Sequence, residues 1–150
     1  MTRIEVIELA EPDSSALYAL VQYAAVSDMT QYDLLMIALR RAFDLIQRYA
    51  DVALLNGRFR VYAEDHQGIV RVYMGGKVES VTDSIGLPVS FNQRGGKVYI
   101  GTDGYAEVVF STIANDADYT RLLPVVLKYA TAIYDGKDAK ELNAILKECI

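Results

Sequence analysis

The chain carries few residues that could perform acid–base or nucleophilic chemistry. It contains one histidine, His66, and one cysteine, Cys149, among its 150 residues. His66 lies in a predicted surface turn beside Glu64 and Asp65, where a histidine usually meets only solvent. Cys149 has no histidine near it in the sequence, which makes it a poor candidate nucleophile. A transition-metal site would have to be built from carboxylates, so we expect no catalytic residue, no metal and no cofactor.

Two glycine-containing segments fail to match known phosphate-binding motifs. Gly75-Gly76-Lys77 lacks the spacing and the following Ser or Thr of a phosphate loop. Arg94-Gly95-Gly96-Lys97 is typical of a hairpin turn, and Asp135-Gly136-Lys137-Asp138 indicates a turn between two helices. The sequence therefore predicts a protein that is not an enzyme.

Basic and aromatic residues alternate with apolar ones between residues 58 and 111. Successive side chains of a strand point to opposite faces, so the alternation separates two surfaces. The apolar set predicts a core face made of Phe59, Val61, Ala63, Val70, Val72, Met74, Val98, Ile100, Ala106, Val108 and Phe110. The other set comprises the candidate binding residues Arg58, Arg60, Tyr62, Arg71, Tyr73, Arg94, Lys97, Tyr99 and Tyr105.

This basic and aromatic set is typical of a surface that binds single-stranded nucleic acid. Cationic groups follow the phosphates, and each base that stacks on an aromatic ring contributes about 1–3 kcal/mol. Unstacked bases expose their faces, which favours single strands over duplexes. The alternative is that tyrosine and arginine simply pack across exposed strands and need no ligand. We expect single-stranded nucleic acid to be the partner, with ssDNA binding as the function and the choice between DNA and RNA left open by the sequence.

Predicted hairpins would bring the candidate residues together on one open face. The segment Arg58–Tyr73 turns at Asp65–Gly68, and the segment Lys97–Phe110 turns at Asp103-Gly104, a strong hairpin signal. Together with strands near residues 77–82 and 89–93, these segments predict an antiparallel sheet of four to six strands. A short strand over residues 3–9 could lie at the sheet edge.

Helical patterns flank the predicted strands on both sides. They predict helices from about residue 14 to 27, from about 31 to 55, from Asn115-Asp116 to Gly136, and from a capping box at Asp138–Glu141 to the C-terminus. The expected fold is one α+β domain, residues 1–150, whose N- and C-terminal helices pack on one face of the sheet. The apolar arc of the long helix is wide enough either to lie between the sheet and another helix or to form a subunit interface.

Net charge and hydropathy limit the possible partners. The net charge of −5 argues mildly against nucleic acid, although residues 57–112 hold six basic and six acidic residues and the acidic excess lies outside them. No signal peptide and no membrane-spanning segment is predicted. We therefore expect a cytoplasmic protein without a membrane partner.

The order of elements resembles the ThermoDBP family, single-stranded DNA-binding proteins of hyperthermophilic archaea. The resemblance lies in the helical N-terminal part, in hairpins such as Arg58–Tyr73 and Lys97–Phe110, and in the C-terminal helices. It implies a cleft lined by apolar and basic groups, and self-association through C-terminal elements. It also implies an archaeal, thermophilic source, with which the absence of Trp agrees.

Two other functions remain open from the sequence. The first is a cellular or viral assembly module, in which copies join into a homo-oligomer through Leu142, Ile145, Leu146 and part of the long helix. The second is a small-molecule or enzyme domain, which would need a deep pocket with perturbed carboxylates. No residue spacing in the chain favours this second alternative.

Overall fold

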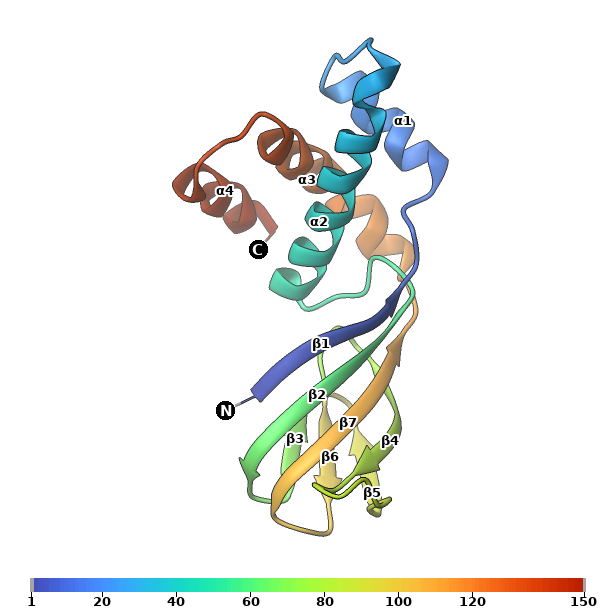
Figure 1. Cartoon of the computed structure of the whole chain (residues 1–150), viewed down its shortest axis with the longest axis vertical. Coiled ribbons are helices and arrows are strands. Elements are labelled where there is room, and N and C mark those ends of the chain that lie inside the picture. The colour runs from blue at the N-terminus through green and yellow to red at the C-terminus, as the bar shows by residue number, and fades with distance from the viewer. Residues whose placement is uncertain (1, 150) are drawn as a thin grey trace. The chain divides into compact units, whose positions relative to one another are not determined.

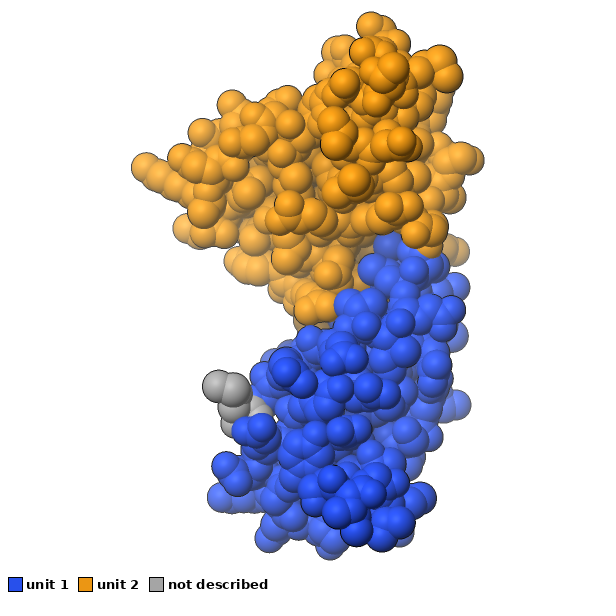
Figure 2. All heavy atoms as spheres, viewed as in Figure 1, with its two compact units in different colours: residues 1–10, 55–114 blue, residues 11–54, 115–150 orange. Residues whose placement is uncertain are grey.

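The computed structural model describes residues 2–149 and confirms the α+β class (Figure 1). The chain divides into two compact units, shown in different colours in Figure 2. Residues 1–10 and 55–114 form one, which we call the sheet unit. Residues 11–54 and 115–150 form the other, which we call the helical unit.

The sheet unit contains two antiparallel sheets rather than one. The first has four strands in the order β1 (Thr2–Leu9), β2 (Gly57–His66), β7 (Gly104–Thr112) and β4 (Lys77–Thr82). The second has three strands in the order β3 (Ile69–Arg71), β6 (Lys97–Ile100) and β5 (Phe91–Arg94). The apolar faces of the two sheets meet, so each sheet covers the other.

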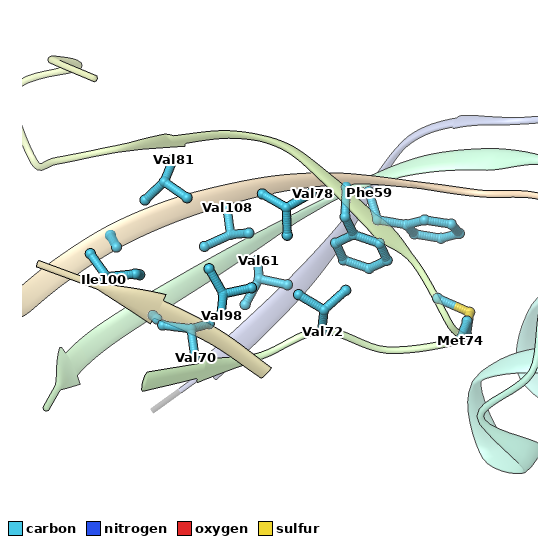
Figure 3. Close-up of a cluster of buried hydrophobic side chains, with 13 residues drawn as sticks. Phe59, Val61, Val70, Val72, Met74, Val78, Val81, Val98, Ile100 and Val108 are labelled. Carbon is cyan, nitrogen blue, oxygen red and sulfur yellow. The ribbon is translucent and has the colours of Figure 1, made fainter. Parts of the chain in front are cut away.

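The core of this unit lies between the two sheets, as Figure 3 shows. Phe59 and Phe110 stack there with ring centroids 5.4 Å apart. The alternation over residues 89–93 also predicts Val89 and Phe91 in the core, but Val89 is only partly buried and Phe91 is 40% exposed. The core residues predicted in the strands at 58–74 and 97–110 are all buried, and Val78 and Val81 of β4 join them. The predicted inward and outward faces of these strands are therefore confirmed.

The predicted pairing of the strands is wrong, although their faces are right. β2 pairs with β1 and β7, whereas β3 pairs with β6, so the turn between β2 and β3 carries the chain from one sheet to the other. The turn at Asp103-Gly104 likewise joins β6 of the second sheet to β7 of the first. Only local alternation is readable from sequence, and either pairing buries the same valines. The predicted turn at Arg94-Gly95-Gly96-Lys97 does join a true hairpin, β5 and β6.

Three of the four helices of the second unit begin at a side-chain cap, whereas the long second helix follows Gln31, which makes no capping hydrogen bond, and the capping box predicted at Thr30–Asp33 is wrong. These helices are α1 (Ser14–Tyr23), α2 (Tyr32–Ala50), α3 (Asp116–Tyr134) and α4 (Ala139–Leu146), with short 3₁₀ turns at Met29–Gln31 and Lys147–Cys149. Asp13, Asn115 and Asp138 each accept a hydrogen bond from a backbone N–H of the first turn. α2 is shorter than predicted because Asp51 adopts a left-handed conformation (φ 56°), which ends the helix.

The helical unit has a core of its own. The rings of Phe43 on α2 and Tyr119 on α3 stack with centroids 5.7 Å apart. Burial raises the pKa of Tyr119, and it also raises the pKa of the Cys149 thiol. Ile145 of α4 is buried within the chain. Within residues 2–149 no helix has the length and apolarity needed to cross a membrane.

Candidate interaction surfaces

The outer face of the four-stranded sheet holds four of the candidate residues, Arg58, Arg60, Tyr62 and Tyr105. Carboxylates from neighbouring strands pair with both arginines. Arg58 donates two hydrogen bonds to Glu79 of β4, at 3.0 and 2.9 Å. This pair raises the pKa of Arg58, since Glu79 stabilises the charged guanidinium.

Arg60 lies at the centre of this face, between two acidic residues. Its guanidinium is 3.7 Å from Glu5 of β1 and 4.0 Å from Glu107 of β7. It also donates to the Tyr62 hydroxyl at 3.2 Å, and that hydroxyl donates to Glu5 at 3.1 Å. The Tyr62 hydrogen bond, with help from the two carboxylates, raises the pKa of Arg60. This face is a mixed network of charges rather than a positive surface.

A small pocket of about 180 Å³ opens on the same face, lined by Arg3, Tyr62, Glu64 and Tyr105. The Arg3 guanidinium lies over the Tyr62 ring, 4.4 Å from its centroid. The Tyr105 hydroxyl donates to Glu107 at 2.8 Å, and this hydrogen bond raises the pKa of the phenol. The Tyr62 ring of this pocket therefore already has a cationic partner, and the Tyr105 hydroxyl already has an acidic one.

The outer face of the three-stranded sheet holds four more candidate residues, Arg71, Arg94, Lys97 and Tyr99, whereas Tyr73 lies beyond the end of β3 and packs half-buried against the core. The strand register places Lys97 directly opposite Arg71 on one side and Arg94 on the other. The guanidinium of Arg71 lies 4.8 Å from the Tyr73 ring centroid, and that of Arg94 lies 5.7 Å from the Tyr99 ring centroid. We call Arg71, Lys97 and Arg94 the basic row.

The nine candidate residues therefore form two surfaces instead of one. The structure places four of them on one outer face of the sandwich, four on the other, and Tyr73 beyond the end of β3, with the shared core between the faces. The alternation along each strand did not reveal the acidic residues that neutralise the first face, above all Glu5 and Glu79. The sequence did predict a strand that contains Glu5, because the apolar residues Ile4 and Val6 flank it in an alternating pattern. Its partner strand could not be read from that pattern.

The long helix α2 presents a row of exposed apolar side chains in the helical unit. Leu34, Ile37, Leu45 and Tyr49 are 53%, 50%, 37% and 45% exposed. Their spacing of three, eight and four residues places them on one side of the helix, and Arg41 lies among them. We call these four residues the α2 stripe. It is the part of the predicted subunit interface that the chain leaves uncovered, whereas Ile145 is buried.

His66 does not lie in an exposed turn, as the sequence suggested. It is the last residue of β2 and is only 8% exposed, opposite Gly104 of β7. Its Nδ1 accepts a hydrogen bond from the backbone N–H of Gly68 at 3.0 Å. In the described part of the chain, no three His, Cys, Asp or Glu side chains are grouped to hold a metal ion.

Comparison with solved structures finds proteins of virus-like particles. The fold is similar to a chain in the neck of an empty GTA particle computed with C6 symmetry, with a TM-score of 0.63 and 15% identity, covering 98% of this chain and 94% of the other. A chain in the virion of a native gene transfer agent (GTA) particle gives 0.59 and 13%, covering 97% and 93%. A chain in the neck of a native GTA particle computed with C12 symmetry gives 0.51 and 17%, covering 94% and 93%. No protein-family model and no curated protein sequence matches the chain.

These similarities overturn the expected function. The chain shares its fold with components of multi-subunit particles, and the predicted resemblance to ThermoDBP, with its single-stranded DNA binding and archaeal source, is wrong. The physical reason is the pairing error: tyrosine and arginine that alternate along strands suggest a single platform only if those strands lie side by side. Each of the two alternating segments divides its strands between the two sheets, and Arg58 and Arg60 already have acidic partners.

Proposed function

We propose that this chain is a non-enzymatic structural subunit of the neck of a gene transfer agent-like particle, where identical copies form a ring. The observation that carries the proposal is the extent of the fold similarity. It spans 98% of this chain and 94% of a neck chain, so both the sheet unit and the helical unit have counterparts there. Two of the similar structures are necks described with six-fold and twelve-fold symmetry.

A ring of identical subunits needs two different, complementary surfaces on each copy. The α2 stripe is a suitable candidate for one of them. Exposed apolar patches on an otherwise well-packed protein commonly mark interaction sites. Leu34 and Ile37 are each about half exposed, although both are large and aliphatic. In contrast, Leu142 and Leu146 are partly buried and Ile145 is fully covered, so α4 has little apolar surface to offer a second copy.

Light scattering combined with size-exclusion chromatography, followed by negative-stain microscopy, tests this function. We expect purified protein to form closed rings as its concentration rises. The double variant Leu34→Glu/Ile37→Glu should shift the population to monomer, because it places charge on the apolar surface. The control is Ile85→Glu, which changes a still more exposed aliphatic residue in the turn between β4 and β5. A wild-type protein that remains monomeric at the highest concentration would contradict the proposal.

A further inference from the structure

β1 is the longest of the four edge strands of the two sheets. It has eight residues and lies beside β2 at the edge of the four-stranded sheet, as Figure 1 shows. β3 and β5, the edges of the other sheet, have three and four residues. The outer side of an edge strand presents backbone N–H and C=O groups with which another strand can pair, so native proteins usually keep such edges short or cover them.

The opposite edge of the same sheet, β4, is covered by its own chain. The backbone N–H of Val89 donates to the carbonyl of Val81 at 2.9 Å. The backbone N–H of Val78 donates to the Gln93 side-chain oxygen at 2.8 Å. Among the described strands β1 pairs with β2 alone, and six of its eight residues are exposed. Within residues 2–149, the chain therefore protects one edge of this sheet and leaves the other open.

The regular part of β1 is bounded by a bulge. Residues from Thr2 to Val6 pair one-to-one with β2, and the register then shifts between Val6 and Glu8. A bulge bends an edge strand and interrupts regular pairing. The segment that an incoming strand can pair with is therefore Thr2–Val6, and its central residue is Ile4.

The charges of this segment are complementary to themselves. Arg3 and Glu5 are exposed on the outer face of the sheet, on either side of Ile4. When two antiparallel copies pair with Ile4 opposite Ile4, each Arg3 lies opposite the Glu5 of the other copy. A shift of two residues is the smallest that keeps outer face beside outer face, and it places Arg3 opposite Arg3 or Glu5 opposite Glu5. The charges and the bulge therefore favour the same register.

The same register covers apolar surface that the sandwich leaves exposed. Val6 lies opposite Phe59 of β2, yet Val6 is 36% exposed whereas Phe59 is fully buried. Ile4 packs only partly against the core. In the paired form the two Ile4 side chains meet, and each Val6 gains Thr2 of the second copy as a cross-strand neighbour. The pairing extends the core face past the edge of β1.

We propose that β1 is a docking edge for a second copy of this chain, whose own β1 pairs with it antiparallel about Ile4. Main-chain hydrogen bonds between edge strands give such contacts their affinity, and alternate side chains give them specificity. The contact is isologous, so it ends at two copies and joins their four-stranded sheets into one continuous sheet. It uses a different surface from the α2 stripe and does not rest on the ring function. Five residues per strand bury little area, so the dimer is weak and is populated at concentrations on the order of 100 μM and above.

A charge exchange between Arg3 and Glu5 tests the register. The parent protein is the full chain with Leu34→Glu/Ile37→Glu, so that the α2 stripe does not contribute. Adding either Arg3→Glu or Glu5→Arg places like charges opposite each other at both symmetric positions. Sedimentation equilibrium should therefore show an association constant that falls roughly tenfold or more. An equimolar mixture of the two variants restores opposite charges at both positions, so it should dimerise as the parent does.

Glu8→Arg is the matched control for Glu5→Arg. It makes the same charge change on the same strand, but beyond the bulge, so the association constant should not change. Amide hydrogen exchange identifies the paired segment independently. Exchange of alternate backbone N–H groups between Thr2 and Val6 should slow as the protein concentration rises, because these groups become hydrogen-bonded in the dimer.

The outcomes separate this contact from the ring function. If the parent stays monomeric at every concentration, if the single variants dimerise as the parent does, or if their mixture stays monomeric, the edge contact is overturned and the ring function is untouched. If wild-type protein forms no ring while the parent dimerises, the proposed function fails and the edge contact stands. Loss of the dimer in both single variants, with recovery on mixing, supports the inference.

Discussion

The two outer faces of the sandwich use similar residues in opposite ways. On the four-stranded sheet, Arg58 and Arg60 alternate with tyrosine and are paired with Glu79, Glu5 and Glu107. On the three-stranded sheet, Arg71, Lys97 and Arg94 also neighbour tyrosines, but they line up with one another. The charge of a face is therefore set by which strands become neighbours, and the residues of a single strand do not determine it.

This difference separates a face whose ion pairs form between neighbouring strands of its own sheet from one whose strands carry no acidic residue. The ion pairs of the first face are partly exposed, and each such pair contributes little to stability. Their main effect is to cancel charge, so that the face offers no net attraction for an anion. The strands of the second face contain no Asp or Glu, so any compensation of its charge comes from residues outside the three-stranded sheet.

The largest loss of stability is expected from a change in the core that separates the two faces. Phe110 is fully buried between the sheets and stacks on Phe59. Phe110→Ala should lower the free energy of unfolding by about 3–5 kcal/mol, since it leaves a cavity in a packed core. Chemical denaturation measures the loss. Val109→Ala, on the outer side of the same strand, is the control and should cost far less; equal losses would contradict the sandwich.

Gly76 lies where the chain passes from the three-stranded sheet to β4 of the four-stranded one. A Cβ at this position would come within 2.2 Å of the Phe110 ring. Gly76→Ala should therefore destabilise the protein by about 1–3 kcal/mol through overpacking. Gly101→Ala is the matched control, because a Cβ at Gly101 meets nothing within 4 Å. Thermal denaturation measures both variants. Equal thermal midpoints for the two would contradict the close packing of Gly76 against Phe110.

The same charge reversal should have opposite effects on the two faces. Arg60→Glu places a third carboxylate beside Glu5 and Glu107, so its Tm should fall. Lys97→Glu places a carboxylate between two arginines, so its Tm should rise. Scanning calorimetry of monomeric samples at low and high salt measures both shifts, which should shrink as salt screens the charges. Tm shifts of the same sign in the two variants would contradict the different charge environments of the two faces.

The smallest expected effect concerns Tyr105, whose raised pKa depends on Glu107. The neutral phenol donates the hydrogen bond, and its folded pKa lies above its unfolded value. Its contribution to stability is therefore complete below the unfolded pKa and is lost as pH rises through the folded pKa. Tyr105→Phe should be slightly less stable than wild type at neutral pH and equal to it once the phenol has ionised. A difference that persists at high pH would exclude this hydrogen bond as the cause.

The sequence alone determined the local features of the chain. Its α+β class, the residues that face the core, and the capping residues Asp13, Asn115 and Asp138 followed from alternation and side-chain chemistry within a few positions. Each of these features depends on contacts between residues close together in the chain, and so a single segment contains the information needed to predict it.

Only the tertiary structure decided which strands are neighbours. The alternation of β2 fits β3 as well as it fits β1 and β7, because a strand has the same two faces whichever partner it has. The actual choice brought Glu5 to Arg60, across 55 positions of the sequence, and placed Lys97 between two arginines. Charges interact through space, so the electrostatic character of each face, and with it the surface available to a partner, was fixed only by the fold.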